Sequence, residues 1–176
     1  DGSLGFNGDG KLVTLADGRR VAVWTHASTA ALDSSSTMEE IFAARDNNDV
    51  YYAIDDGTGF GAPIRLAATA GTDADLDVTT LADGSVAVAW TSTAADGTAT
   101  LMTVSIGANG AGSVTEVASG LLSNVSITAA GNELVLSWDL DTDSTADGTA
   151  IEVHTASLID GVLTGGGFDV TPLMAE

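Results

Sequence analysis

The chain has 176 residues, 44% of them hydrophobic, which is enough apolar material for a folded core and excludes a disordered segment. Its 25 Asp and Glu residues against 5 Lys and Arg residues give a net charge of −20, so electrostatic repulsion disfavours binding to nucleic acid. Cysteine is absent, which excludes disulfides and thiolate metal sites, and the apolar runs are far shorter than the roughly 20 residues of a membrane-spanning helix.

The first ten residues contain four glycines and end in a turn-like Asp-Gly pair. In shorter form they resemble the segment Asp160–Phe168 near the other end of the chain. We therefore expect residues 1–10 to supply the end strand of a preceding repeat. The chain begins at Asp1 with no initiator Met and no basic leader, so we expect it to be a piece of a longer protein.

A ten-residue motif occurs three times and organises the rest of the chain. Each copy reads as a tight turn followed by an apolar strand that ends on Trp; the copies are Leu15–Trp24, Leu81–Trp90 and Ala129–Trp138. The turn pairs are Asp17-Gly18, Asp83-Gly84 and Gly131-Asn132. All three pairs accept positive φ, which predicts a two-residue hairpin turn of type I′ in every copy.

Each repeat is predicted to contain four short strands joined by hairpins. The predicted repeats are residues 11–70, which carry an insertion at 25–48, then 71–120 and 121–176. In the second motif, Val86, Val88 and Trp90 share one face of the strand, and Ala87 and Ala89 share the other. Strands that are apolar on both faces belong in sheets that are covered on both sides.

Successive Trp residues are 66 and 48 residues apart. Four strands recurring at this spacing predict an all-β, β-propeller-like array of about three four-stranded antiparallel blades. A β-sandwich is the alternative, although a sandwich does not require the four-strand unit to recur. Three blades do not close a ring, so we expect flanking repeats, a second copy or a partner chain to complete the array. The three Trp residues are interpreted as blade core rather than as sugar-stacking platforms.

The insertion at 25–48 contains a helix-start signal. Thr37 is followed three residues later by Glu40, the spacing of a capping box, and Met38, Ile41 and Phe42 would share one face of a helix of about two turns. One interpretation is a hairpin decoration that lies over its own blade. The other is that Met38, Ile41 and Phe42 form a contact site for a partner.

A further pattern extends over residues 78–171. Its elements are Leu81-Ala-Asp-Gly84, Trp90, Asp96-Gly97, Asn109-Gly110, Asp147-Gly148, Asp160-Gly161 and Gly166-Gly167-Phe168-Asp169-Val170. This pattern resembles a repeat of large secreted RTX-type bacterial proteins, although the Gln-Arg pair of that repeat and the nonapeptide calcium repeats are absent. The resemblance implies a propeller-like module of a secreted or cell-surface protein, without enzymatic activity.

An acidic loop in the third repeat is a candidate calcium site. Carboxylates at its positions 1, 3, 5 and 9, with a main-chain carbonyl at position 7, are oxygen ligands of the kind that Ca²⁺ prefers. These residues are Asp139, Asp141, Asp143, Asp147 and, through its carbonyl, Thr145. Position 6 carries Ser144 where such loops usually carry Gly, so an acidic solvated hairpin is the alternative. Asp73, Asp75 and Asp77 would share one face of an extended strand and form a second, weaker candidate.

The sequence offers little for catalysis. Its two histidines, His26 and His154, lie in different repeats and outside any nucleophile motif. We therefore predict a non-catalytic structural or adhesive module of a secreted bacterial surface or filament protein. The alternatives are a calcium-dependent ligand-binding domain for a carbohydrate or protein and, more remotely, a glycan hydrolase acting through paired carboxylates.

Overall fold

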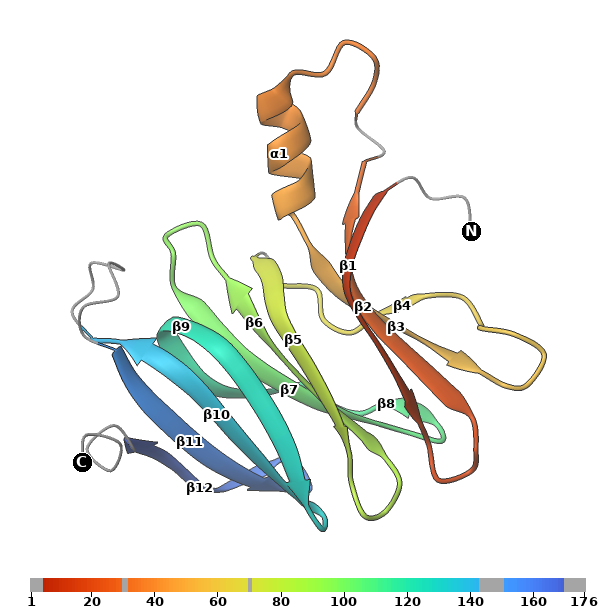
Figure 1. Ribbon diagram of the computed structural model, residues 1–176, viewed down its shortest axis with the longest axis vertical. Coiled ribbons are helices and arrows are strands. Elements are labelled where there is room, and N and C mark those ends of the chain that lie inside the picture. Colours follow the sequence, from red (N-terminus) through yellow and green to blue (C-terminus); the bar gives the residue numbers. More distant parts are fainter. Residues whose placement is uncertain (1–4, 30–31, 70, 143–150, 170–176) are drawn as a thin grey trace.

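The structure is a computed structural model that describes residues 5–29, 32–69, 71–142 and 151–169. In these residues the chain forms antiparallel sheets with one short helix, which confirms the all-β prediction (Figure 1). The helix, α1, covers Met38–Asp46, and no helix in the described part of the chain is long and apolar enough to cross a bilayer. The strands group into three antiparallel meanders, here called units 1 to 3.

Unit 1 is a four-stranded sheet in which the strands follow one another in chain order. Its strands are β1 (Gly5–Thr14), β2 (Arg20–Ser28), β3 (Asp49–Asp55) and β4 (Ile64–Arg65). The described part of the segment assigned to a preceding repeat, residues 5–10, belongs to β1, and residues 5–8 pair with residues 25–28 of β2. This stretch lengthens the first strand of unit 1, which differs from the predicted boundary at residue 10.

Units 2 and 3 share one continuous strand. The strands of unit 2 are β5 (Thr72–Thr80), β6 (Val86–Thr93), β7 (Ala99–Gly107), the short β8 (Gly110–Ala111) and the first part of β9 (Thr115–Ala130). Those of unit 3 are the rest of β9, β10 (Glu133–Asp141), β11 (Ile151–Ile159) and β12 (Val162–Asp169). Gly120 pairs with β7, whereas Leu121 already pairs with β10, so the units meet between these two residues.

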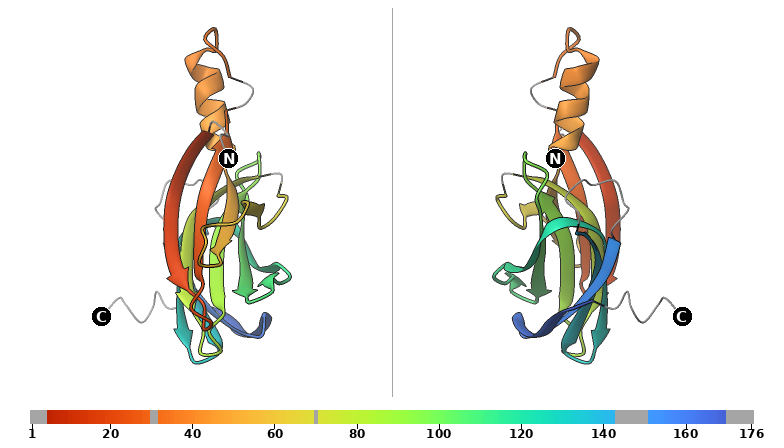
Figure 2. Two further views of the ribbon diagram at one scale, coloured as in Figure 1. Left: turned by 90° about the vertical axis from the view of Figure 1, so that its right-hand side faces the viewer. Right: turned by 90° about the vertical axis from the view of Figure 1, so that its left-hand side faces the viewer.

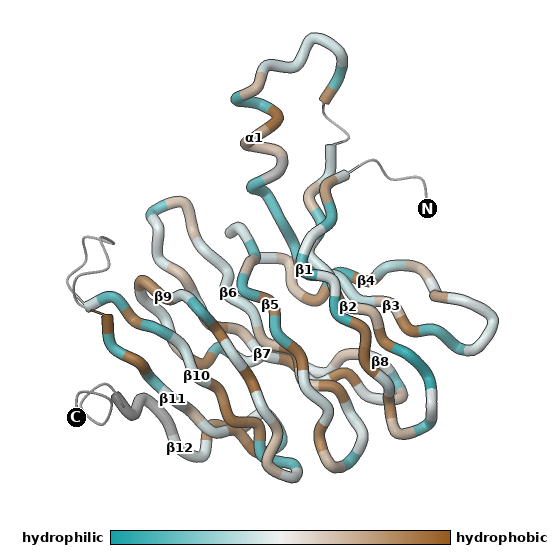
Figure 3. The backbone as a smooth tube through the Cα atoms, viewed as in Figure 1, coloured by the Kyte–Doolittle hydropathy of each residue, from teal (hydrophilic) through white to brown (hydrophobic). Residues whose placement is uncertain are grey.

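The three units lie side by side with their first strands on the same side of the molecule. In Figure 1, β1, β5 and β9 lie toward the viewer, and the side views of Figure 2 place β8 and β12 on the opposite side. β5 contacts both β1 and β9, so the first strands are neighbours across the array. Figure 3 shows hydrophobic residues along the strands of each unit.

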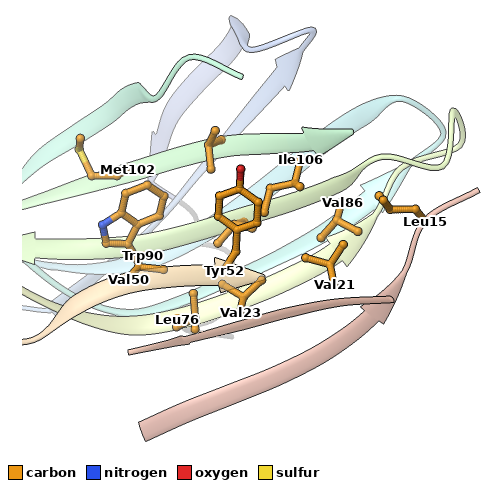
Figure 4. Packing of buried hydrophobic residues seen from close by; sticks show 12 residues of the cluster. Leu15, Val21, Val23, Val50, Tyr52, Leu76, Val86, Trp90, Met102 and Ile106 are labelled. Carbon is orange, nitrogen blue, oxygen red and sulfur yellow. The ribbon is translucent and has the colours of Figure 1, made fainter. Parts of the chain in front are cut away.

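The core consists of two layers, one between each pair of adjacent units. The face of each unit that bears the repeated Trp is here called its Trp face, and the opposite face its back face. Between units 1 and 2, Val21 and Val23 on the back face of unit 1 pack against Val86, Val88 and Trp90 on the Trp face of unit 2 (Figure 4). This layer covers the Trp face of unit 2.

The second layer repeats this arrangement one unit further on. Ala87 and Ala89 on the back face of unit 2 pack against Leu134, Leu136 and Trp138 on the Trp face of unit 3. Trp90 is 0% exposed and Trp138 is 3% exposed. The interpretation of these two Trp residues as core is confirmed.

A β-bulge opposite each Trp is a repeated feature that sequence periodicity did not predict. In the first strand of each unit, a residue with positive φ interrupts the pairing register: Asp9 (φ 48°), Asp75 (φ 51°) and Asn124 (φ 54°). Two residues then oppose one, which is the geometry of a bulge. Asp and Asn tolerate the left-handed conformation better than other side chains do, and this explains the residue type at these positions.

The predicted type I′ turns are wrong for the repeated motif. In units 1 and 2 the motif forms a three-residue loop, because Leu15 and Leu81 each pair across it and only Gly18 and Gly84 have positive φ. In unit 3 the turn has two residues, with positive φ at Gly131 alone, as in type II′. Asp160-Gly161, the turn between β11 and β12, has positive φ at both residues, as type I′ requires.

The motif turns also join one unit to the next. The Ala16 N–H donates to the carbonyl of Gly84 at 3.0 Å, and the Ala82 N–H donates to the carbonyl of Gly131 at 2.9 Å. A Cβ placed on Gly84 would lie 2.1 Å from that of Ala16, so this close approach requires glycine. The repeated motif therefore specifies a contact between units as well as a hairpin.

Candidate functional site

The Trp face of unit 1 forms an open groove of about 840 Å³. Its floor is aromatic: the rings of Trp24 and Tyr51 stack with centroids 6.2 Å apart and planes 23° apart, and His26 meets Tyr51 edge-on at 5.6 Å. Nδ1 of His26 lies 2.8 Å from Oδ1 of Asn7, which holds the imidazole in place. Trp24 is only partly buried, in contrast to the other two Trp residues.

The groove is open because no described unit covers the Trp face of unit 1. In every unit, the repeated Trp lies opposite one residue of the third strand: Trp24 opposite Tyr51, Trp90 opposite Met102 and Trp138 opposite His154. Trp90, Met102 and Trp138 are buried against the preceding unit, whereas no described unit precedes the first pair. The three Trp residues occupy the same position of the repeat, so periodicity alone does not distinguish the partly buried Trp24 from the other two.

Ion pairs border the groove. Arg20 pairs with the Asp55 carboxylate and lies 5.7 Å from the centre of the Phe60 ring. Hydrogen bonds from the Gly57 N–H, and then from Arg20, hold the pKa of Asp55 below its ordinary value. The guanidinium of Arg65 pairs in the same way with Asp49, which lines the groove. The cations at this border are therefore already neutralised by carboxylates of the same unit.

Asp73 is a buried carboxylate at the junction of units 1 and 2, with 0% of its surface exposed. Its carboxylate accepts hydrogen bonds from the Val50 N–H at 3.1 Å and the Thr69 hydroxyl at 3.0 Å, and Ser92 is a further side-chain partner. Burial raises the pKa of Asp73 despite these donors. Since Val50 lies in β3 and Asp73 in β5, this contact joins one unit to the next.

The predicted convergence of Asp73, Asp75 and Asp77 is wrong. The bulge at Asp75 breaks the alternation of the strand, and the three carboxylates have different partners. Asp77 accepts a hydrogen bond from the Ile127 N–H of β9 at 3.0 Å and lies 3.8 Å from Nζ of Lys11 in β1. Asp77 therefore links the first strands of all three units.

The calcium candidate lies only partly within the described residues. Asp139 and Asp141 are at the end of β10, and Asp139 accepts a hydrogen bond from the Asn124 side chain at 2.7 Å. Asp143, Thr145 and Asp147 lie outside the described residues. Within the described part, no group of three or more His, Asp or Glu side chains is placed to hold a metal ion.

The predicted helix and its capping box are confirmed. The Thr37 hydroxyl accepts from the Glu40 N–H, and the Glu40 carboxylate accepts from the Thr37 N–H at 2.7 Å. The helix projects beyond the strand ends instead of lying over its own sheet (Figures 1 and 2). Met38 and Phe42 are 61% and 46% exposed, and Ile41 is partly buried, so the predicted contact face is accessible.

The two histidines stay apart in separate units and have local partners. His154 stacks on Trp138 with ring centroids 5.9 Å apart, and its Nε2 lies 3.0 Å from a carboxylate oxygen of Glu152. His26 belongs to the groove of unit 1. The structure therefore does not bring the two imidazoles together into one site.

Comparison with known proteins shows a similarity of fold. No family model and no curated protein matches the chain. Among solved structures, the chain is similar to one described as Hadza microbial sialidase Hz136, with a TM-score of 0.58 and 14% sequence identity. The match covers 92% of this chain and 33% of that chain. This similarity concerns the fold, and the chain spans one third of the sialidase.

Proposed function

We propose that the chain is a non-catalytic structural module: about three blade-like units of a β-propeller-like array in a secreted bacterial surface or filament protein. The observation that carries this proposal is the use of the same contact twice. Each internal junction buries a repeated Trp against the back face of the unit before it. Repetition of the same contact from one unit to the next is the way in which propeller blades and other repeat proteins build a core.

The polar groups support a structural role. Asp73 and Asp77 are engaged in contacts between units, and the Asp residues of the turns bind the backbone of their own loops. Turn Asp residues are expected for this conformational reason alone. The carboxylates of Asp73, Asp77 and these turns therefore have structural partners.

Glycan hydrolysis is the competing function, because the similar solved structure is described as a sialidase. A sialic acid substrate carries a carboxylate, so its recognition requires cationic side chains. The chain has five Lys and Arg residues, and the four whose side chains are described are all in ion pairs with Asp: Lys11, Arg19, Arg20 and Arg65. With a net charge of −20 in addition, the electrostatics favour the structural role.

A deletion of one repeat period tests the modular role. Removing residues 83–130 joins β5 to the turn of unit 3 and keeps the strand order of a unit, so the back face of unit 1 meets Leu134, Leu136 and Trp138. We expect a cooperatively folded β-protein that is less stable than the parent chain, as judged by circular dichroism and by the dispersion of NMR chemical shifts. The matched control removes residues 83–118 and places two first strands in succession, which we expect to prevent folding.

If both deletions unfold the chain, the units are not interchangeable and the modular role is wrong. The enzymatic alternative is checked on the intact chain with fluorogenic sialosides and neutral glycosides. We expect no turnover above the buffer rate. Hydrolysis that copurifies with the folded chain would overturn the non-catalytic assignment.

A further inference from the structure

We infer that the open Trp face of unit 1 docks onto the back face of unit 3 in a second copy of this chain. This inference rests on the proposed stacking role and names the partner that completes it. Every internal junction joins a Trp face to a back face. The chain has one face of each kind that no described unit covers, and these are the two halves of one further junction.

The back face of unit 3 reproduces the face that already covers a Trp. On unit 2, Ala89 pairs across the strands with Thr103, and both side chains are buried beneath unit 3. The equivalent pair on unit 3 is Ser137 with Thr155, and both of these residues retain accessible surface. A short side chain in β10 beside Thr in β11 therefore leaves the same space for an incoming indole.

The Trp face of unit 1 has the complementary shape. Trp24 and Tyr51 occupy the positions that Trp90 and Met102 fill in the junction between units 1 and 2. Ala22 and Ala53 pair beside them, and the groove gives the aromatic floor access to a second sheet. An aromatic face that is covered in two units and open in the third indicates the same kind of cover for the third.

Net charge determines how this docking depends on salt. The overall charge of −20 acts against association, and salt screens this repulsion. We therefore expect association to strengthen with ionic strength.

The contact is heterologous, because different faces meet. Two copies form a closed ring where the rotation between successive units allows it, and other rotations give larger assemblies. This head-to-tail geometry has a consequence that a symmetric dimer lacks. Blocking either face in one copy leaves the other face of that copy competent.

The experiment uses the intact chain in sedimentation velocity and light scattering over a dilution series, at low salt and at about 1 M NaCl. Trp24→Lys blocks the Trp face and Ser137→Lys blocks the back face. Each variant alone should lose self-association by about 30-fold or more, as expected for a central contact of an interface. An equimolar mixture should recover a dimer and nothing larger, since one intact junction remains. Ala95→Lys, in the exposed turn between β6 and β7 of unit 2, is the control and should associate like the parent chain.

Quenching of Trp fluorescence gives an independent reading that needs no variant. Trp90 and Trp138 are buried within the chain, so dilution should expose Trp24 alone to acrylamide. Circular dichroism confirms that the variants fold, and Trp24→Ser replaces Trp24→Lys if the charge prevents folding. A parent chain that stays monomeric at high salt, or a mixture that recovers no dimer, overturns the docking. The repeat deletion tests stacking within one chain, so its result distinguishes this failure from failure of the proposed function.

Discussion

Truncation of Trp90 is the sharpest stability test of the stacked arrangement. A fully buried Trp side chain of about 200 Å², at about 25 cal/mol per Å², contributes about 5 kcal/mol to the free energy of unfolding. Measured Trp and Phe truncations to Ala in cores cost about 3–5 kcal/mol. The indole N–H of Trp90 has no hydrogen-bond acceptor among the described atoms, and its removal relieves part of the loss. We therefore expect Trp90→Ala to lower stability by about 3 kcal/mol.

Trp24→Ala is the matched comparison, because it removes the same side chain from the same strand position on an open face. We expect a loss of about 1 kcal/mol, measured at a dilution where the chain is monomeric. The assay is urea denaturation followed by far-ultraviolet circular dichroism, supported by thermal melting. For a chain of this size, about 3 kcal/mol corresponds to a fall in Tm of roughly 6–12 °C. Equal losses for the two variants would refute the assignment of Trp90 to a covered face and Trp24 to an open one.

Three further outcomes are expected. The raised pKa of Asp73 means that this carboxyl stabilises the native state in acid, and that the stabilisation is lost as the pH rises above 3.8, the ordinary pKa of Asp. The stability of Asp73→Asn relative to the parent should therefore improve from about pH 4 to pH 7. A difference in urea denaturation that does not change with pH would contradict this. At the bulge, Asp75→Val should cost about 1–2 kcal/mol because a β-branched residue resists positive φ, whereas Asp75→Gly should cost far less by the same denaturation assay. For the acidic loop at 139–147, Ca²⁺ should raise Tm relative to EDTA and Asp143→Ala should remove the increase; melting curves that Ca²⁺ does not move would leave the acidic hairpin as the interpretation.

Strand positions were predictable because burial on both faces leaves a strong local pattern. In β6, the alternation of Val and Ala indicates which side chains share a face, and both faces are indeed covered. The helix start was predictable for a similar reason, since the capping box of Thr37 and Glu40 is a contact within four residues. Features set by local geometry could therefore be derived from the sequence.

Features that depend on contacts between units could not be derived from the sequence. Turn geometry follows from where the strands must end, so Asp17-Gly18 became part of a three-residue loop although the pair suits a two-residue turn. The bulges at Asp9, Asp75 and Asn124 place the strand around a Trp that lies fifteen or fourteen residues further along the chain. In retrospect, the recurrence of Asp or Asn at that spacing was the available signal.

The faces of the units and the connections between their strands are constrained to different degrees. The faces are constrained, because each must match the neighbouring sheet. The connection between the second and third strands can vary in length and structure. In unit 2 it is a tight turn at residues 94–98, and in unit 1 it is the helical insertion. Replacing residues 28–47 by the sequence of residues 94–98 should therefore preserve the fold.

The expected effect of this replacement on stability is small and favourable. Each halving of a flexible loop lowers the entropy cost of closure by about 0.6 kcal/mol, so two halvings give a gain of about 1 kcal/mol. Urea denaturation measures this gain, and sedimentation tests whether self-association is unchanged. A loss of more than about 1 kcal/mol would show that α1 stabilises β2 by packing. Unchanged folding and association would show that the helix with Met38, Ile41 and Phe42 is separate from the faces that build the array.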